Sequence, residues 1–235
     1  MNAIIFDMDD TLYNRLTPFS KAYTKMFGQR FSIECRPLRA AFTRYGDEVF
    51  EDSMNHRISM EDMYVYRIQK ALADFGEHIS REEALAFQTS YGWFQNHIEL
   101  SSPLTGLMEY CSHAGVFLGI ITNGPSTHQR DKCRALGVEK WIAPEHIIAS
   151  GDIGINKPDP EIFSIAARRW NLDLERTWYV GDSYEHDVLC PHAVGWQSIW
   201  LDRKGRAAEI PDNPAALTVH TEEELFSGVK ILLGV

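Results

Sequence analysis

Two carboxylates stand at the end of the first apolar segment of this chain, where catalytic groups are often found. Residues 3–6 read Ala-Ile-Ile-Phe, and so short an apolar run predicts a buried strand. Asp7 and Asp9 follow it closely. Because ligands of open α/β sheets bind at the carboxyl ends of the strands, both side chains are expected at a ligand-binding edge. Acids at such positions also serve as turn formers or helix caps, so other groups must decide their role.

Three more groups of polar side chains follow predicted elements further along the chain. A hydroxyl, an amide and a glycine end the apolar segment 116–122, a lysine lies in the turn before a helix, and two acids follow the segment 178–180. Each group taken alone is better explained as a cap, a turn or a solvated lysine. Together they place polar side chains at one edge of a sheet, which predicts a single functional site. The residues are Thr122 and Asn123, Lys157, and Asp182 with Asp187.

The charges of these groups select the chemistry. Three or four carboxylates that converge repel one another unless a cation lies between them. A small set of hard oxygen ligands, with positions left for water and substrate, suits Mg²⁺. The metal and Lys157 would together offset the charge of a phosphate, and the Thr122 hydroxyl with nearby backbone N–H groups would hold the phosphoryl oxygens. The sequence therefore predicts a magnesium-dependent site for a phosphorylated substrate.

The first two acids suit a covalent route in two steps. With the phosphate held, Asp7 attacks phosphorus and forms an aspartyl phosphate. Asp9 protonates the leaving oxygen and then deprotonates the water that completes the reaction. The predicted reaction is the hydrolysis of a phosphomonoester.

The order of the predicted elements indicates how the site is built. From residue 16 to about residue 98 the patterns are helical throughout, and from residue 103 onward helices and strands alternate. That alternation predicts an α/β fold, a doubly wound parallel sheet with helices on both faces. The first strand must belong to the same sheet, so the helical block is an insertion after strand one. The expected organisation is an α/β core of residues 1–14 and 100–235 and a helical domain of residues 15–99.

Two helices of the inserted block carry a recognisable start. Ser59 and Ser80 each precede an amphipathic segment and are followed three residues later by an acid, Asp62 and Glu83, as in a capping box. The predicted helices are 16–31, 38–50, 59–75, 80–96, 104–113, 126–136, 160–170, 186–194 and 222–233, and the later strands are 116–122, 147–149, 178–180, 198–201 and 217–219.

The four groups, in this order, resemble the four-motif pattern of the haloacid dehalogenase (HAD) superfamily. The pattern begins with Asp7-Met8-Asp9-Asp10-Thr11 and continues through Thr122, Lys157-Pro158-Asp159-Pro160 and Gly181-Asp182 to Asp187. The resemblance implies a Rossmann-like core. It also implies that the helical block is a C1-type cap, a lid over the site.

The resemblance also implies a role for each matching residue. Asp7 would be the nucleophile and a Mg²⁺ ligand, and Asp9 the acid/base and a Mg²⁺ ligand through its backbone carbonyl. Thr122 and Asn123 would contact the phosphate, Lys157 would stabilise both the phosphate and Asp7, Asp182 would complete the metal site, and Asp187 would orient neighbours or bind the metal through water.

One position separates the branches of this family. The dehalogenase branch lacks an acid where Asp9 stands, because ester hydrolysis there needs no protonated alkoxide leaving group. The acid is present in this chain, so the resemblance favours phosphoryl transfer. Transfer of the phosphoryl group to water is favoured over mutase chemistry, since the sugar-phosphate mutases of this family usually have glycine where Asp10 stands. The alternatives are a phosphomutase of the same fold and a non-catalytic phosphoacceptor or scaffold protein. Response-regulator receivers lack the helical insertion and are about half this length.

Composition limits the setting and the partners. The 235 residues are 44% hydrophobic, enough for one large or two modest domains. A net charge of -10 argues against nucleic acid or an anionic membrane as the main partner. The four cysteines form no CxxC pair and are expected to be reduced, and with neither a signal peptide nor a membrane span expected, the protein is predicted to be cytoplasmic. The expected partner is a small phosphorylated metabolite, and a monomer or a homodimer fits equally well.

Overall fold

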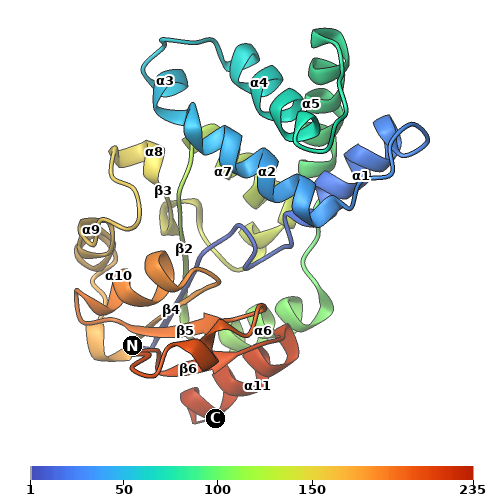
Figure 1. Cartoon of the computed structure of the whole chain (residues 1–235). Coiled ribbons are helices and arrows are strands. Elements are labelled where there is room, and N and C mark those ends of the chain that lie inside the picture. Colours follow the sequence, from blue (N-terminus) through green and yellow to red (C-terminus); the bar gives the residue numbers. More distant parts are fainter. Residues whose placement is uncertain (1, 235) are drawn as a thin grey trace. The chain divides into compact units, whose positions relative to one another are not determined.

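The structure, a computed structural model, describes residues 2–234 and contains a six-stranded parallel sheet (Figure 1). The strand order is β3-β2-β1-β4-β5-β6, and every neighbouring pair is parallel. The parallel sheet predicted from the alternation of helices and strands is therefore confirmed. The strands are β1 (Ala3–Phe6), β2 (Phe117–Thr122), β3 (Ile147–Ala149), β4 (Thr177–Gly181), β5 (Gln197–Leu201) and β6 (Leu217–Val219).

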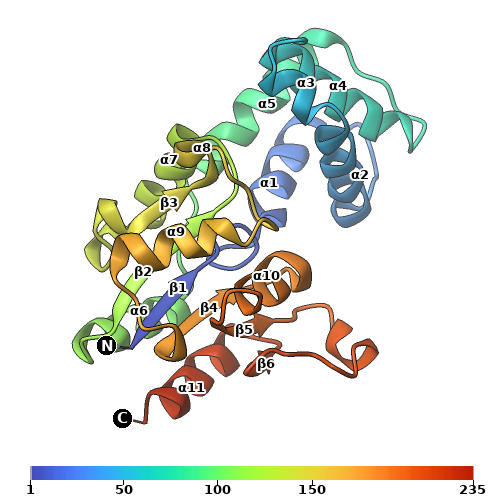
Figure 2. The ribbon, with the colours of Figure 1, turned by 90° about the vertical axis from the view of Figure 1, so that its left-hand side faces the viewer.

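β1 lies between β2 and β4 in the interior of the sheet, which explains its unbroken apolar sequence. All four of its residues are buried, as expected for a strand covered on both faces. Successive side chains point to opposite faces, and Ile5 belongs to a buried cluster with Phe163 of helix α9 (Glu161–Trp170). Figure 2 shows α9 and α10 (Cys190–His192) over one face of the sheet and α6 (Ser102–His113) and α11 (Glu222–Leu233) over the other.

Two helical features close in sequence to the predicted site residues were not predicted. The turn α8 (Ser150–Ile153) lies between β3 and Lys157, so that lysine does not follow its strand directly. The predicted helix 186–194 is instead a π-helical segment, Tyr184–Leu189, continued by α10. π-helical turns are rare and often occur at functional sites. The remaining elements are α7 (Ser126–Leu136) and the 3₁₀ segments Val138–Lys140, Pro144–His146, Leu174–Arg176 and Arg206–Glu209.

The chain divides into two compact units. One contains the described residues up to Asn14 and from Glu99 onward, and the other is Arg15–Ile98, which is entirely helical and inserted between β1 and β2. The core of the helical unit is aromatic, with the fully buried rings of Phe19 and Phe87 meeting edge to face at 5.6 Å. Its helices are α1 (Leu16–Phe27), α2 (Cys35–Glu48), α3 (Phe50–Met54), α4 (Met60–Ala73) and α5 (Arg81–Gln95).

Serine caps fix the starts of α4 and α5, as the sequence predicts. The Ser80 hydroxyl accepts a hydrogen bond from the Glu83 backbone N–H, and the Glu83 carboxylate accepts one from the Ser80 backbone N–H. Ser59 accepts from the Asp62 backbone N–H, but the Asp62 carboxylate accepts from the Ser59 hydroxyl instead of its N–H. The capping box is thus complete at Ser80, whereas Ser59 is a simple cap.

The cysteines of this chain are free thiols. Cys111, Cys133 and Cys190 are buried, and burial raises the pKa of each thiol to about 12. They are therefore protonated at neutral pH and are not nucleophiles. Among the described residues, no helix combines the length and the apolar character that a membrane crossing requires.

Candidate active site

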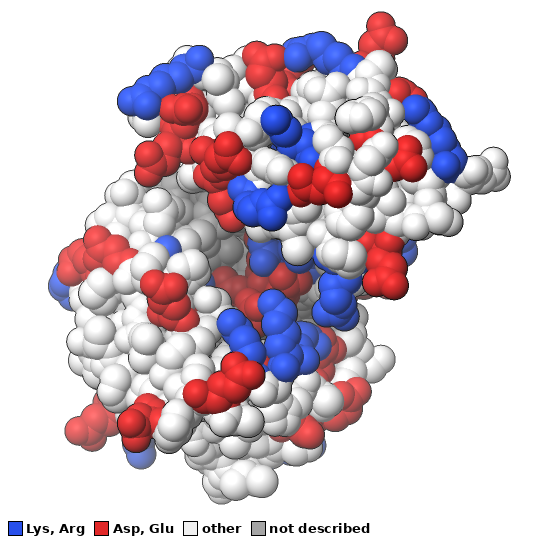
Figure 3. Space-filling view, in the orientation of Figure 1, with Lys and Arg blue, Asp and Glu red and all other residues white. Residues whose placement is uncertain are grey.

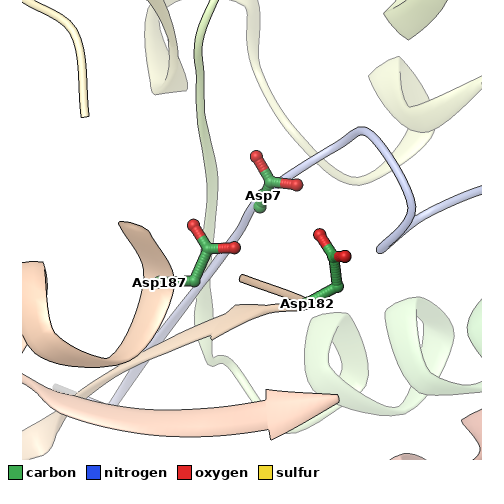
Figure 4. A group of neighbouring side chains, drawn as sticks. All are labelled: Asp7, Asp182 and Asp187. Carbon is green, nitrogen blue, oxygen red and sulfur yellow. The ribbon is translucent and has the colours of Figure 1, made fainter. Parts of the chain in front are cut away.

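Three aspartates meet at the carboxyl end of the central strands. Asp7 directly follows β1, and its backbone N–H donates to the Val180 carbonyl of β4 at 2.8 Å. Asp182 directly follows β4, and Asp187 lies in the π-helical segment beyond it. One carboxylate oxygen from each of the three lies within 4.8 Å of the others, and Figure 4 shows the side chains converging. The structure thus brings together the acids predicted at two separate strand ends.

A buried lysine is bonded to two of these acids. The Lys157 ammonium lies 2.9 Å from Oδ1 of Asp7 and 2.6 Å from Oδ1 of Asp187, and the residue is 4% exposed. Its third partner is the Tyr179 hydroxyl at 2.7 Å, so all three of its N–H donors have acceptors. Burial alone would lower the pKa of Lys157, but the carboxylates of Asp187 and Asp7 hold it well above its usual value. The site therefore contains a permanent positive charge.

The Asp7 carboxyl is poised between its charged and neutral forms. Burial raises its pKa from 3.8 to about 7, and the charges of Asp187 and Asp182 add to this rise while Lys157 opposes it. Its Oδ2 also accepts a hydrogen bond from the Thr11 hydroxyl at 3.2 Å. One lysine does not balance three neighbouring carboxylates, so the group has an excess of negative charge that a proton or a metal cation would relieve.

Asp9 lies apart from the three-aspartate cluster and has its own cation. The Lys132 ammonium of α7 lies 2.7 Å from Oδ1 and 2.9 Å from Oδ2 of Asp9. The Tyr13 hydroxyl donates to Oδ1 at 2.5 Å. The Asp9 side chain is 20% exposed, whereas the Lys132 side chain is 4% exposed. Lys132 and Tyr13 thus bind the Asp9 carboxylate, which remains partly exposed to solvent.

Thr122 and Asn123 end β2 beside this group, but the Asn123 side chain has another use. Its amide nitrogen donates to the Lys157 carbonyl at 2.7 Å, and its amide oxygen accepts from the Lys157 backbone N–H at 2.9 Å. These two bonds tie the end of β2 to the loop that carries the lysine, whose peptide bond to Pro158 is cis. Thr122 is buried at the strand end. Of the predicted phosphate-binding residues, Asn123 is therefore bonded to the Lys157 backbone, and Thr122 precedes it at the end of β2.

Gly181 allows Asp187 to reach the centre of the group. A Cβ at residue 181 would lie 2.3 Å from the Asp187 carboxylate carbon, so only glycine fits there. Asp187 is further fixed because its Oδ2 accepts from the Ser183 backbone N–H at 2.9 Å. With Oδ1 on Lys157 and Oδ2 on Ser183, the Asp187 carboxylate is held mainly by protein donors.

Three residues of this site were not predicted from the sequence. Tyr179 reads as an ordinary core aromatic of β4, yet its hydroxyl accepts from Lys157 and donates to the Ile121 carbonyl at 2.6 Å. Tyr13 is also buried and carries no signal of its own. Lys132 does carry one, because with Gln129 it lies on the buried stripe of α7 that also contains Cys133 and Leu136. A lysine at core spacing is rare unless it is paired.

The surface charge does not reveal this arrangement. Figure 3 shows acidic and basic side chains interspersed on the face in view. Lys157 and Lys132 are 4% and 3% exposed, so neither contributes appreciably to the surface. The positive charges of Lys157 and Lys132 are therefore internal.

Known proteins resemble this chain in sequence and fold. Residues 1–195 match the family model described as haloacid dehalogenase-like hydrolase. The chain is 26% identical over 251 aligned residues to phosphoserine phosphatase of Thermus thermophilus, covering 96% of this chain and 98% of that protein. It is 24% identical over 230 residues to glyceraldehyde 3-phosphate phosphatase of Methanopyrus kandleri, covering 89% and 87%. The magnesium-bound YfnB of Bacillus subtilis shares the fold, with a TM-score of 0.72 and 22% identity over 100% of this chain and 99% of that one.

Proposed function

This chain belongs to the haloacid dehalogenase-like hydrolases, and we propose that it is a magnesium-dependent phosphomonoesterase that works through an aspartyl phosphate on Asp7. The observation that carries the proposal is the position of Asp7. It lies at the carboxyl end of the sheet, bonded to the buried Lys157 and within 4.8 Å of Asp182 through carboxylate oxygens. A nucleophile, a fixed cation and a cluster of hard oxygen ligands then share one point.

The donor set of this site fits Mg²⁺. Asp7 and Asp182 offer carboxylate oxygens, and the Asp9 backbone carbonyl follows from the same loop as Asp7. We assign these three groups to the metal and give Asp187 the supporting role of orienting Lys157, whose ammonium donates to Oδ1 of Asp187 at 2.6 Å. A magnesium ion bound there would supply positive charge that offsets the approach of a phosphate to a carboxylate.

The side chains then divide the work of two successive steps. Asp7 attacks phosphorus, the bond between phosphorus and the ester oxygen breaks, and Asp9 gives a proton to the departing oxygen. Asp9 next takes a proton from water as the water oxygen bonds to phosphorus, and the bond between Asp7 and phosphorus breaks to release inorganic phosphate and the free Asp7 carboxylate. Throughout, Lys157 and Thr122 hold the phosphoryl oxygens, together with the backbone N–H of Asn123 because its side chain is bonded to the Lys157 loop.

The substrate that we propose is a small phosphorylated metabolite. Two relatives are named as phosphatases of phosphoserine and of glyceraldehyde 3-phosphate, which are both small phosphomonoesters. We assign selection among such esters to the helical unit Arg15–Ile98 acting as a cap, since the core residues named above interact with the phosphate and not with the group attached to it.

Phosphate release from a panel of esters tests the proposal. The panel contains p-nitrophenyl phosphate, phosphoserine, glyceraldehyde 3-phosphate, sugar phosphates and nucleoside monophosphates, each with Mg²⁺ and with EDTA. Turnover is expected only with Mg²⁺, and Asp7→Asn is expected to lower it by more than about 10³-fold. Asp212→Asn, at an exposed loop position, is the matched control and should match the unaltered protein.

Each arm of this experiment can contradict one part of the proposal. Full activity in EDTA would refute the metal site. Near-normal activity of Asp7→Asn would refute the nucleophile. A folded protein that hydrolyses none of these esters would refute the phosphomonoesterase assignment.

A further inference from the structure

Lys132 has no part in the two steps described above, although it contacts the proposed acid/base. Its ammonium lies 2.7 and 2.9 Å from the two carboxylate oxygens of Asp9. The Tyr13 hydroxyl donates to the same carboxylate, and the Tyr13 ring centre lies 5.9 Å from the Lys132 ammonium. We propose that Lys132, assisted by Tyr13, is a positioning residue that fixes the Asp9 carboxylate for proton transfer to the leaving group. This inference rests on the proposed function of Asp9.

Stability does not account for a charge at this point of α7. Lys132 shares the buried stripe of the helix with Gln129, Cys133 and Leu136, where an apolar side chain of similar length would pack. Replacing a buried ion pair by apolar residues is often neutral or stabilising. Asp9 is also partly exposed and can be hydrated without a lysine. The role of this buried ammonium is therefore to hold the Asp9 carboxylate, and not to stabilise the core around it.

The geometry of the contact restricts the rotation of the carboxylate. The last side-chain torsion of an aspartate is broad when nothing holds it. One ammonium bonded to both oxygens removes that freedom, and the second bond from Tyr13 to Oδ1 makes the two oxygens unequal. A misplacement of about 1 Å of a catalytic group can cost on the order of 10²-fold in rate.

The same helix also fixes the phosphate-binding loop. α7 begins three residues after Asn123, and its Gln129 side chain donates to the Asn123 carbonyl at 2.8 Å. Lys132 lies about one turn further along and reaches Asp9. A single rigid element therefore sets the distance between the proposed phosphate-binding groups and the proposed proton donor.

A comparison of two leaving groups tests this role in the whole protein. p-Nitrophenyl phosphate releases a stabilised phenolate that needs little protonation, whereas an alkyl phosphomonoester releases an alkoxide that needs the proton of Asp9. The value of kcat/KM reports the steps up to the aspartyl phosphate for both esters. Lys132→Met is expected to lower kcat/KM by about 10²-fold for the best alkyl ester of the panel and by less than about threefold for p-nitrophenyl phosphate.

Three further variants complete the design. Lys132→Arg keeps the charge and should recover most of the loss for the alkyl ester. Tyr13→Phe should show the same preference for p-nitrophenyl phosphate with a smaller loss, about tenfold for the alkyl ester, and it decides the question if Lys132→Met does not fold. Lys140→Met removes an exposed lysine just beyond α7 and should change neither value.

The results separate the inference from the proposed function. Equal losses for the two esters, or no loss in the folded Lys132 and Tyr13 variants, would overturn the positioning role while the phosphatase activity stands. Absence of turnover in the unaltered protein would overturn the proposed function itself, and the inference with it.

Discussion

Lowering the pH from 8 to 6 is expected to weaken Mg²⁺ binding to this protein about tenfold. The cause is the Asp7 carboxyl, whose pKa burial raises from 3.8 to about 7 in the metal-free protein. A protonated carboxyl is a poor ligand, so the metal and the proton compete for the same group. A carboxylate with an ordinary pKa would be fully ionised at both pH values, and its metal affinity would not change between them.

The magnitude follows from the fraction of Asp7 that carries a proton. With a pKa of about 7, that fraction is about 0.9 at pH 6 and about 0.1 at pH 8, and binding of Mg²⁺ should release the corresponding number of protons. The raised pKa of Asp7 also affects folding, but with the opposite dependence on pH: Mg²⁺ affinity rises with pH, whereas the stability of the metal-free protein falls. Between about pH 4 and pH 7 the folded state holds a proton that the unfolded state has lost, so stability of the metal-free protein falls by roughly 4 kcal/mol as the pH rises through that window.

Isothermal titration calorimetry measures both quantities. Mg²⁺ is titrated at pH 6 and pH 8 in two buffers of different ionisation enthalpy, and the difference between the buffers gives the number of protons released. Asp7→Asn is the matched control, because its amide keeps the size of the side chain and one oxygen ligand for Mg²⁺ but cannot titrate. In that variant the dependence on pH between 6 and 8 should disappear.

Two results would refute the reasoning. The first is a Mg²⁺ affinity that is the same at pH 6 and pH 8 with no proton release, which would mean that the site leaves Asp7 ionised. The second is an unchanged proton release in Asp7→Asn, which would place the titrating group elsewhere.

Three other substitutions have defined outcomes. Tyr179→Phe removes an acceptor of the buried Lys157 ammonium and should lower the free energy of unfolding by about 1–3 kcal/mol, measured by urea denaturation; an unchanged midpoint would show that the hydroxyl is dispensable. Gly181→Ala places a Cβ 2.3 Å from the Asp187 carboxylate carbon, so it should displace that acid from Lys157 and lower kcat by about 10²-fold, and normal steady-state kinetics would contradict this. Asp10 has a φ of 65°, a region that β-branched residues avoid, so Asp10→Val should cost about 1–2 kcal/mol in thermal unfolding while Asp10→Gly is tolerated; equal melting temperatures for the two would exclude backbone strain.

Local patterns in the sequence were sufficient to predict the fold class. The spacing of apolar residues predicted the strands and most of the helices that pack on the sheet. It did so because a strand buried on both faces, or a helix buried along one stripe, requires apolar residues at regular positions in the sequence. The start of α5 was equally predictable, since Ser80 and Glu83 are three residues apart and bond to each other. The π-helical segment Tyr184–Leu189 and the turn α8 were not, because single turns leave too few residues for a period to be seen.

The side chains that could carry the chemistry were also readable in the sequence. Asp7, Thr122 and Asp182 each directly follow or end a strand, and parallel strands bring their carboxyl ends to one edge of the sheet. Their types and order matched a known family, and that family is confirmed. Their roles in catalysis remain predictions for the experiments above.

Only the tertiary structure revealed what holds these side chains in place. Lys132 and Asp9 are 123 residues apart, and no local pattern in the sequence predicts that they form an ion pair. Tyr179 looks like a core aromatic until its hydroxyl is found between Lys157 and a carbonyl of β2. The Asn123 amide, which was predicted to contact a phosphate, is bonded to the Lys157 backbone. The sequence alone determined which groups stand at the sheet edge, because strand order and polarity are local properties. The structure decided which group bonds to which, because those partners are chosen by packing between segments far apart in the chain.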